Sequence, residues 1–517
     1  MIARRALLAA GLLLPAAARA RGADPVATAL AGRYRGRAEG GVEAFRGIRY
    51  GQGTASRRFQ APAAPVPVRD TLSATEFAAS CPQAGDRDLR QDEDCLFLNV
   101  WTPGADPRAK RPVMVYFHGG AYSSGTVVEP RVFGDRLAAG GDVVVVTVNQ
   151  RLHALGYLYL DRLAPGFADS GNAGQLDLIL ALAWVRDNIA AFGGDPGRVM
   201  VFGQSGGGAK IATLMGTPAA KGLFHAAATM SGQQVTASGP LNATRRARAY
   251  LAKLGVAERD LSPLLTMPVA RLVEGLAAED PILGGGVYFG PVLDMKWLTR
   301  HPFWPDANPQ GNAIPLILGN TRDETRAFID PAGPKLAGLD WSNLAERIAP
   351  ELRIDAHPEW VVGQYRARFP RMTPVDLFYA ATTAGRSWRG QVIEAEERAA
   401  AGAPAWVYQL DFASPVAPAR GAPHGHDIPL VFGTLGAEGA LTGTGIEAQW
   451  LSHTMMQAFV SLARTGDPNC AAVPDWPRYT LPDRATMVFD RTTRAEKDPR
   501  RWERELFARI PYIQPGT

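Results

Sequence analysis

The chain has 517 residues, of which 46% are hydrophobic and 20% are charged, and this composition is typical of a globular protein with a large core. The formal net charge is +5, but the basic residues are scattered and form no run interleaved with aromatic residues. A nucleic-acid partner is therefore not expected.

The first twenty residues have the pattern of an export signal. A pair of arginines near the start is followed by a mainly apolar run and then by Ala18-Arg19-Ala20, a small-x-small cleavage site. The apolar run is too short to span a membrane, and no later run is long enough. We therefore expect a signal peptide at 1–20 and a periplasmic or secreted mature chain at 21–517. The sequence leaves open whether the arginine pair marks a twin-arginine signal.

Short apolar runs bounded by Gly, Pro or polar residues predict a series of strands. The runs cover residues 44–50, 58–62, 95–101, 113–117, 143–148, 199–202, 226–230, 314–318 and 406–410. The first two fit an N-terminal β-meander. The run at 143–148 is the richest in β-branched residues, so it is the best candidate for a central strand.

Helical spacing of apolar residues follows several of these strands. The clearest helices are expected at 176–192, 209–215 and 450–465, while 236–283 and 336–391 look like less regular helical insertions that cap a sheet. Strands that alternate with helices predict an α/β fold with a mostly parallel sheet and helices on both faces. No repeat or low-complexity linker interrupts the chain, so residues 21–517 are expected to form a single domain.

A candidate nucleophile lies between the strand at 199–202 and the helix at 209–215. Gly203-Gln204-Ser205-Gly206-Gly207 is a G-x-S-x-G turn in the strand-to-helix context that this motif requires. Such a turn holds Ser205 in a strained conformation and lifts its hydroxyl clear of the sheet. The alternative is a glycine-rich turn that merely contains a serine.

A second loop, His118-Gly119-Gly120-Ala121, directly follows the strand at 113–117. Loops of this H-G-G type provide backbone N–H groups that bind the oxyanion in esterases. The expected donors are the N–H groups of Gly120, Ala121 and Gly206. The alternative is an ordinary tight turn.

A serine nucleophile needs a base, and the base needs an acid that orients it. Asp323 and Glu324 follow the strand at 314–318, and the spacing leaves open which of them acts as the acid. His424 and His426 lie in a loop that follows the strand at 406–410. A rival interpretation of this loop is metal binding by these two histidines and Asp427. The other histidines lack such a context, and the one in the H-G-G loop is expected to be structural.

These motifs resemble those of the type-B carboxylesterases, the α/β-hydrolase family that includes the cholinesterases. Residues 192–207 match the serine-site pattern of that family, and 93–103 match its second signature except at Phe97. Further similar segments are 149–152, 171–174 and 464–469. The resemblance covers essentially the whole mature chain.

The resemblance implies an α/β-hydrolase fold and a serine hydrolase acting on small to medium carboxylic esters. It places the acid on Glu324 and the base on His424 rather than His426, which gives a Ser-His-Glu triad with Ser205. It also implies a disulfide between Cys81 and Cys95, as an oxidising compartment would permit. The resemblance implies no metal and no organic cofactor, and the expected partner is a small-molecule ester.

Three further residues depart from the family pattern. Gln204 replaces the glutamate before the serine, and this weakens the case for choline esters because a carboxylate there would favour a cationic substrate. Thr325 replaces the glycine after the acid, and Ala121 replaces the third glycine of the oxyanion loop, where its methyl group is expected to restrict bulky acyl groups. Two other functions stay open: hydrolysis of an amide or thioester, and non-catalytic binding. The sequence does not indicate the oligomeric state.

Overall fold

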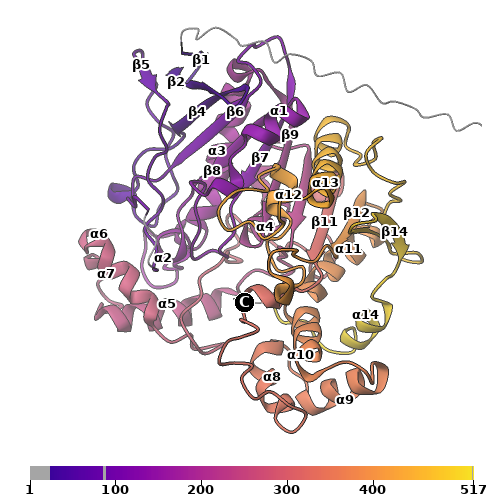
Figure 1. Cartoon of the computed structure of the whole chain (residues 1–517). Helices are drawn as coiled ribbons and strands as arrows, with labels where there is room; N and C mark the ends of the chain where they lie inside the picture. The colour runs from indigo at the N-terminus through magenta and orange to yellow at the C-terminus, as the bar shows by residue number, and fades with distance from the viewer. Residues whose placement is uncertain (1–23, 86–88, 515, 517) are drawn as a thin grey trace, which may run out of the picture.

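The structure, a computed structural model, describes residues 24–85, 89–514 and 516. The predicted signal peptide at 1–20 lies outside these residues. The main element is an 11-stranded sheet in the order β14-β13-β12-β11-β10-β9-β7-β8-β6-β4-β3 (Figure 1). Its strands are β3 (Arg37–Glu39), β4 (Val42–Arg49), β6 (Phe97–Thr102), β7 (Arg111–Phe117), β8 (Val144–Val148), β9 (Gly194–Gln204), β10 (Ala226–Met230), β11 (Leu316–Thr321), β12 (Ala405–Leu410), β13 (Ala485–Phe489) and β14 (Arg494–Lys497).

In the sheet order, the seven neighbouring strands β13, β12, β11, β10, β9, β7 and β8 run parallel. The strands at the two ends of the sheet pair antiparallel. A separate small sheet joins three N-terminal strands: β1 (Val26–Ala29), β2 (Gly32–Arg35) and β5 (Thr71–Ser73). The mostly parallel sheet confirms the α/β class that was predicted from the alternating pattern.

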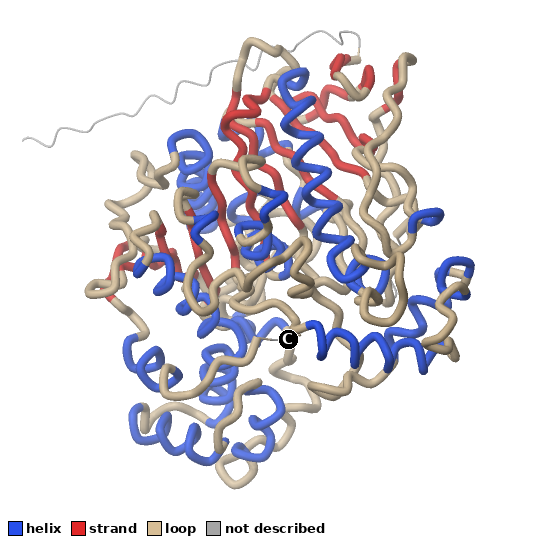
Figure 2. Tube along the Cα trace, turned by 180° about the vertical axis from the view of Figure 1, so that it is seen from behind, coloured by secondary structure: helices blue, strands red, loops and turns tan. Residues whose placement is uncertain are grey.

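Both faces of the large sheet are buried. In β7, Val113 and Val115 pack in the same core as α3 (Ala173–Asn188) and α4 (Gly206–Met215). Met114 and Tyr116, which point the other way, pack in the core with α1 (Asp135–Gly141), α12 (Ile428–Phe432) and α13 (Ile446–Thr465). Since successive strand residues face opposite sides, an unbroken apolar strand requires helices on both. Figures 1 and 2 show these two helical layers from opposite sides.

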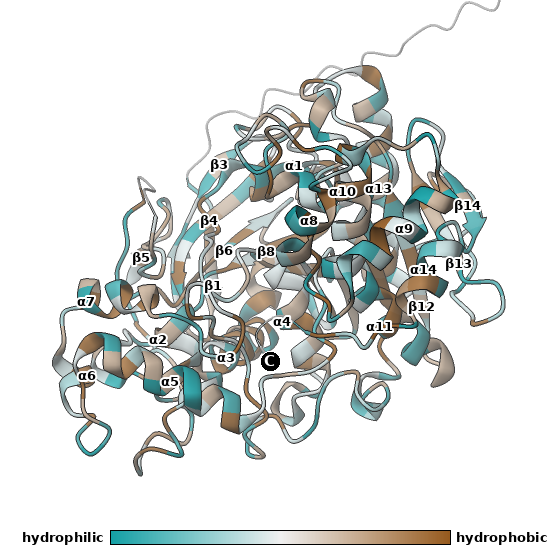
Figure 3. Cartoon of the chain, turned by 90° about the horizontal axis from the view of Figure 1, so that it is seen from below, coloured by the Kyte–Doolittle hydropathy of each residue, from teal (hydrophilic) through white to brown (hydrophobic). Residues whose placement is uncertain are grey.

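Two helical insertions lie beyond the carboxyl ends of the parallel strands. The first follows β10 and contains α5 (Pro240–Leu254), α6 (Pro263–Thr266) and α7 (Val269–Glu274). The second follows β11 and contains α8 (Leu344–Leu352), α9 (Pro358–Arg368) and α10 (Pro374–Thr383). The next helix, α11 (Arg389–Ala400), packs against β11 and β12 and leads back into the sheet. Seen from below in Figure 3, α5–α7 and α8–α10 lie on either side of α4. A site at this end of the sheet is therefore enclosed by the insertions.

Most predicted strands are confirmed, but the segment at 58–62 is not a strand. Phe59 has a φ of 63°, and Arg58 turns inward to form a buried ion pair with Glu93 at 2.5 Å. Pro62, at the end of this segment, also limits strand pairing. The run at 143–148 becomes β8, which is an interior strand, although β9 occupies the middle of the sheet. In the described part of the chain, no helix is long and apolar enough to cross a membrane.

Candidate active site

The predicted serine turn joins β9 to α4, and Ser205 lies where the chain reverses. Its φ of 56° and ψ of −125° define a conformation that costs a non-glycine residue about 1–3 kcal/mol. The N–H of Ser205 donates to the carbonyl oxygen of Met230 at 2.7 Å, which ties the turn to β10. A Cβ at Gly207 would lie 1.9 Å from the carbonyl oxygen of Phe117, so this position requires glycine. The turn leaves Ser205 partly exposed.

The predicted oxyanion loop lies directly against this turn. A Cβ at Gly206 would be 2.1 Å from the carbonyl oxygen of Ala121, and one at Gly119 would be 3.2 Å from the Cβ of Ser205. Gly120 and Ala121 have φ values of 82° and 55°. No described residue accepts a hydrogen bond from the N–H of Gly120 or Ala121. The close approach thus brings the three predicted donors together beside the serine, as an oxyanion hole requires.

Lys210, a residue that the sequence did not single out, supports the oxyanion loop from below. Its side chain is fully buried in α4, and its Nζ donates to the carbonyl oxygens of Ala121 at 2.8 Å and His118 at 3.1 Å. The same Nζ lies 5.4 Å from the ring centre of Tyr122. Within the described chain, no carboxylate forms an ion pair with Lys210, and burial lowers its pKa to about 7.

The predicted acid and base are in contact. Glu324, at the turn after β11, is fully buried, and its Oε2 accepts a hydrogen bond from Nδ1 of His424. Its Oε1 accepts hydrogen bonds from the side chain of Asn320 at 3.0 Å and from the N–H of Thr321 at 2.9 Å. Burial acts to raise the pKa of Glu324, but the imidazole and the hydrogen bonds outweigh it and lower the pKa. The carboxylate is therefore ionised when His424 takes up a proton.

The remaining nitrogen of the imidazole is available for a further partner. Nε2 of His424 is buried and has no hydrogen-bond partner among the residues that the structure describes, so the bond to the Ser205 hydroxyl is not formed. The histidine loop nevertheless lies beside the serine turn, since a Cβ at Gly425 would be 3.7 Å from the side-chain nitrogen of Gln204. Hydrogen bonds of this kind are often long or misaligned before a substrate binds.

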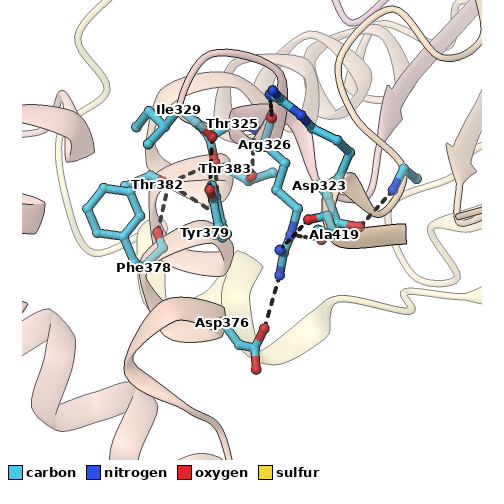
Figure 4. Close-up of polar contacts among 12 residues, drawn as sticks. Asp323, Thr325, Arg326, Ile329, Asp376, Phe378, Tyr379, Thr382, Thr383 and Ala419 are labelled. Carbon is cyan, nitrogen blue, oxygen red and sulfur yellow. Dashed lines mark hydrogen bonds and ion pairs between the residues drawn. The ribbon is translucent and has the colours of Figure 1, made fainter. Parts of the chain in front are cut away.

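The second carboxylate of the acid turn has a different role. Asp323 exchanges hydrogen bonds with Ala422: its N–H donates to the carbonyl oxygen of Ala422, and its Oδ2 accepts from the N–H of Ala422, both at 3.0 Å. Arg326, drawn with Asp323 in Figure 4, donates to the carbonyl oxygen of Ala419 at 2.9 Å and to Asp376 at 3.0 Å. Asp323 therefore fastens the loop that carries His424 to the turn that carries Glu324. Of the two carboxylates, Glu324 is the one that contacts His424.

Thr325, which departs from the family's glycine, anchors the acid turn to α10. Its hydroxyl lies 2.8 Å from Oγ1 of Thr382 and 3.0 Å from Oγ1 of Thr383, and it donates to the carbonyl oxygen of Tyr379 at 3.2 Å (Figure 4). All these groups are buried. A fully satisfied buried network restricts the position of the acid.

The rival metal interpretation is not supported by the side-chain directions. His426 is buried and its ring stacks on that of Phe412, with 6.2 Å between the ring centres. Asp427 accepts a hydrogen bond from the hydroxyl of Tyr408 at 2.7 Å. His424 turns instead to Glu324. In the described ranges, no group of three or more His, Cys, Asp or Glu residues could hold a metal ion.

Cys81 and Cys95 are both buried and are free thiols in the structure. A hydrogen bond with Cys81, together with burial, raises the pKa of the Cys95 thiol well above its usual value. The two residues of the predicted disulfide are therefore neighbours, but the structure has no bond between them.

The chain is similar to known carboxylesterases over most of its length. The model of the carboxylesterase family matches residues 23–506. The para-nitrobenzyl esterase of Bacillus subtilis is 36% identical over 504 residues, which cover 93% of this chain and 98% of that protein. The phenmedipham hydrolase of Pseudarthrobacter oxydans is 31% identical over 487 residues, with 90% and 94% covered. A crystal structure of a Geobacillus stearothermophilus carboxylesterase superposes with a TM-score of 0.83 at 35% identity and covers 93% of this chain and 99% of its own.

Proposed function

The chain belongs to the carboxylesterase family and hydrolyses carboxylic esters, and on this basis we propose that it works through an acyl-enzyme formed on Ser205. His424 takes the hydroxyl proton as Oγ attacks the ester carbonyl, and the Glu324 carboxylate stabilises the imidazolium. His424 then protonates the leaving alcohol. In the second half of the reaction, His424 activates a water molecule that releases the acid and regenerates Ser205.

The negative charge of the tetrahedral intermediate develops on the former carbonyl oxygen. The N–H groups of Gly120, Ala121 and Gly206 stabilise it by donating hydrogen bonds. Their arrangement before any substrate binds means that little reorganisation is needed in the transition state. A rotation of the Ser205 side chain would complete its hydrogen bond to His424, whose Nε2 has no other partner.

The observation that supports this proposal best is the hydrogen bond between Glu324 and His424. These residues are 100 positions apart, and the acid is fully buried with its second oxygen held by Asn320 and Thr321. An acid placed in this way holds one imidazole tautomer and leaves the other nitrogen for the nucleophile.

A fluorophosphonate probe tests the proposal, because it labels only a serine that a neighbouring base activates. We expect one label per chain, located on Ser205 and lost in Ser205→Ala and in His424→Ala. Labelling of another residue, or none in a folded protein that hydrolyses p-nitrophenyl butyrate, would contradict the mechanism. Absence of both labelling and hydrolysis would favour the non-catalytic alternative, whereas a panel of matched amides and thioesters tests the related acyl bonds.

Export and a disulfide belong to the same proposal. The charged start, apolar run and cleavage site at 1–20 support secretion or a periplasmic location of the mature enzyme. In an oxidising compartment the neighbouring thiols of Cys81 and Cys95 would form a disulfide. The mass of the protein recovered from the medium or periplasm, before and after reduction, tests both the cleavage and the bond.

A further inference from the structure

The cationic side chain of Arg386 and the proposed base His424 both contact the ring of Phe328. Phe328 follows the acid turn, and its ring centre is 4.9 Å from that of His424. On Phe328 lies the guanidinium of Arg386, 4.5 Å from the ring centre. Arg386 belongs to the π-helical turn Ala384–Trp388, which joins α10 to α11. Such turns inside helices are frequent at functional sites because they redirect a side chain.

Arg386 has no acid partner in the described part of the chain. The nearby Glu324 is committed to His424, and Glu351 forms an ion pair with Lys335. Burial, followed by the charge of Arg353, lowers the pKa of Arg386 to about 10, so the side chain remains cationic at neutral pH. A largely buried guanidinium is usually paired with an anion, because desolvating its charge without compensation is costly.

An open cleft lies beside Arg353, whose charge acts on Arg386. It has a volume of about 490 Å³ and is lined by Tyr288 and Arg353, among others. The ring of Tyr288 is 6.5 Å from that of Tyr122, the residue after the oxyanion donor Ala121. Asp280 also lines the cleft, but its carboxylate forms an ion pair with Arg246, with 2.7 Å between Oδ2 and Nε. Asp355 lies next to Arg353 at the exposed rim.

Phe328 adds an apolar surface to the same region, with 46% of it exposed although it lies next to His424. A guanidinium without an acid partner lies over Phe328, which contacts the proposed base His424, and this arrangement suits a substrate that carries a carboxylate. Arginine binds carboxylates in a bidentate geometry, and its planar group can stay stacked on the ring while it does so.

From this arrangement we propose that Arg386, assisted by Arg353, forms a carboxylate-binding subsite, and that the preferred substrates are esters bearing a second, free carboxylate. The inference rests on the proposed function, because it assigns a specificity to the same serine-histidine centre. Arg386 is a specificity residue here and takes no part in proton transfer. Cationic esters, such as those of choline, are expected to be poor substrates, in line with the neutral Gln204 before the nucleophile.

The test compares matched neutral and anionic esters. p-Nitrophenyl butyrate is the neutral substrate, p-nitrophenyl glutarate carries a carboxylate on the acyl side, and para-butyryloxybenzoate carries one on the alcohol side. We expect the wild-type enzyme to prefer at least one of the two anionic esters. In Arg386→Gln, kcat/KM for that ester should fall about tenfold through KM, as expected for a lost charge-assisted contact, while p-nitrophenyl butyrate changes less than about twofold.

Arg366→Gln is the matched control, because Arg366 stacks in a similar way on Trp341 at 4.4 Å but belongs to α9. This substitution should leave kcat/KM for all three substrates unchanged. A wild-type enzyme without preference for either anionic ester overturns the subsite, and so does an equal loss on all three esters in Arg386→Gln. Failure of the proposed function would look different, since the wild type would then hydrolyse none of the three.

A measurement on the wild type keeps the inference testable if Arg386→Gln does not fold. Raising the salt concentration about tenfold should increase KM for the anionic ester and leave KM for p-nitrophenyl butyrate unchanged, because salt screens the charge pair. Arg353→Gln should weaken the same preference by a smaller factor. A KM for the anionic ester that does not change with salt concentration would also reject the subsite.

Discussion

Lys210 provides the most informative single perturbation of the site. Lys210→Met removes the ammonium but retains most of the length and apolar character of the side chain. The carbonyl oxygens of Ala121 and His118 then lose the donor that holds them at 2.8 and 3.1 Å. These two residues are the first and last of the loop whose N–H groups are proposed to bind the oxyanion.

The expected size of the effect follows from distance. Nζ is hydrogen-bonded to the peptide oxygen of Ala121, so it lies about 5–8 Å from an oxyanion bound at the N–H of the same residue. Burial lowers the pKa of Lys210 to about 7, so the full charge is present only below that pH and the assay is run at about pH 6. At an effective dielectric constant of about 20, a unit charge at that range contributes about 2–3 kcal/mol. This corresponds to a decrease of about 30–200-fold in kcat. KM should change little, because the neutral ground state does not feel the charge to the same extent.

The assay is the steady-state hydrolysis of p-nitrophenyl butyrate, together with the affinity for a trifluoromethyl ketone that forms an anionic adduct with the serine. Both kcat and the affinity for the ketone should fall by similar factors in Lys210→Met. Lys253→Met, at an exposed position of α5, is the control and should have no effect. A folded Lys210→Met that keeps kcat within about threefold of the wild type would lose far less than the lower estimate of about 30-fold. In that case Lys210 only fills the core and the reasoning is wrong.

Three further perturbations test the other parts of the site. Glu324→Gln should lower kcat about 10³-fold, as expected when the base loses its orienting charge, whereas Asp323→Asn, which keeps an oxygen for the N–H of Ala422, should stay within about fivefold; equal losses would refute the assignment of the acid. Gly206→Ala should cost about 10²-fold in kcat because the new Cβ would come 2.1 Å from the carbonyl oxygen of Ala121, and Gly363→Ala, where nothing lies within 4 Å, is the control. Burial lowers the pKa of His426 from 6.5 to about 4, so between these values only the unfolded chain binds the proton and stability falls as the pH drops. His426→Phe should remove about 2 kcal/mol of the decrease in unfolding free energy between pH 7 and pH 4.5, measured by urea unfolding. An unchanged pH dependence would show that His426 is not responsible.

The parts of the predicted site that local sequence patterns indicate lie in two short segments. Ser205 and its neighbours stand out because a strand, a glycine-rich turn and a helix occur in immediate succession. The same holds for the H-G-G loop, which follows β7 without a gap. In each case the chemistry depends on backbone geometry over a few residues, and glycine spacing records that geometry directly.

Groups that act through tertiary contacts were harder to predict. A lysine five residues after the serine looks like an ordinary helix residue, and only the packing of α4 under the oxyanion loop shows the role of Lys210. Spacing left Asp323 and Glu324 equivalent, and the resemblance to a family was needed to separate them. Thr325 was recognised only as a departure, since its partners Thr382 and Thr383 lie nearly 60 positions away.

The errors in the fold have similar causes. The segment at 58–62 alternates like a strand, but the ion pair of Arg58 with Glu93 and the positive φ of Phe59 hold it as a loop. The edge strand β14, Arg494–Lys497, was not predicted, because it is mostly exposed and has no apolar period to reveal it. Hydrophobic patterns report burial, so they miss elements that hydrogen bonding alone maintains.

The central claim is that ester hydrolysis passes through a covalent acyl group on Ser205. Rapid-quench mass spectrometry of the enzyme during turnover of p-nitrophenyl butyrate tests it most directly. The mechanism predicts a butyryl adduct on the peptide that contains Ser205, formed within the first turnover and absent from a folded Ser205→Ala variant that no longer hydrolyses the ester. Turnover without any adduct, or an active Ser205→Ala variant, would contradict it.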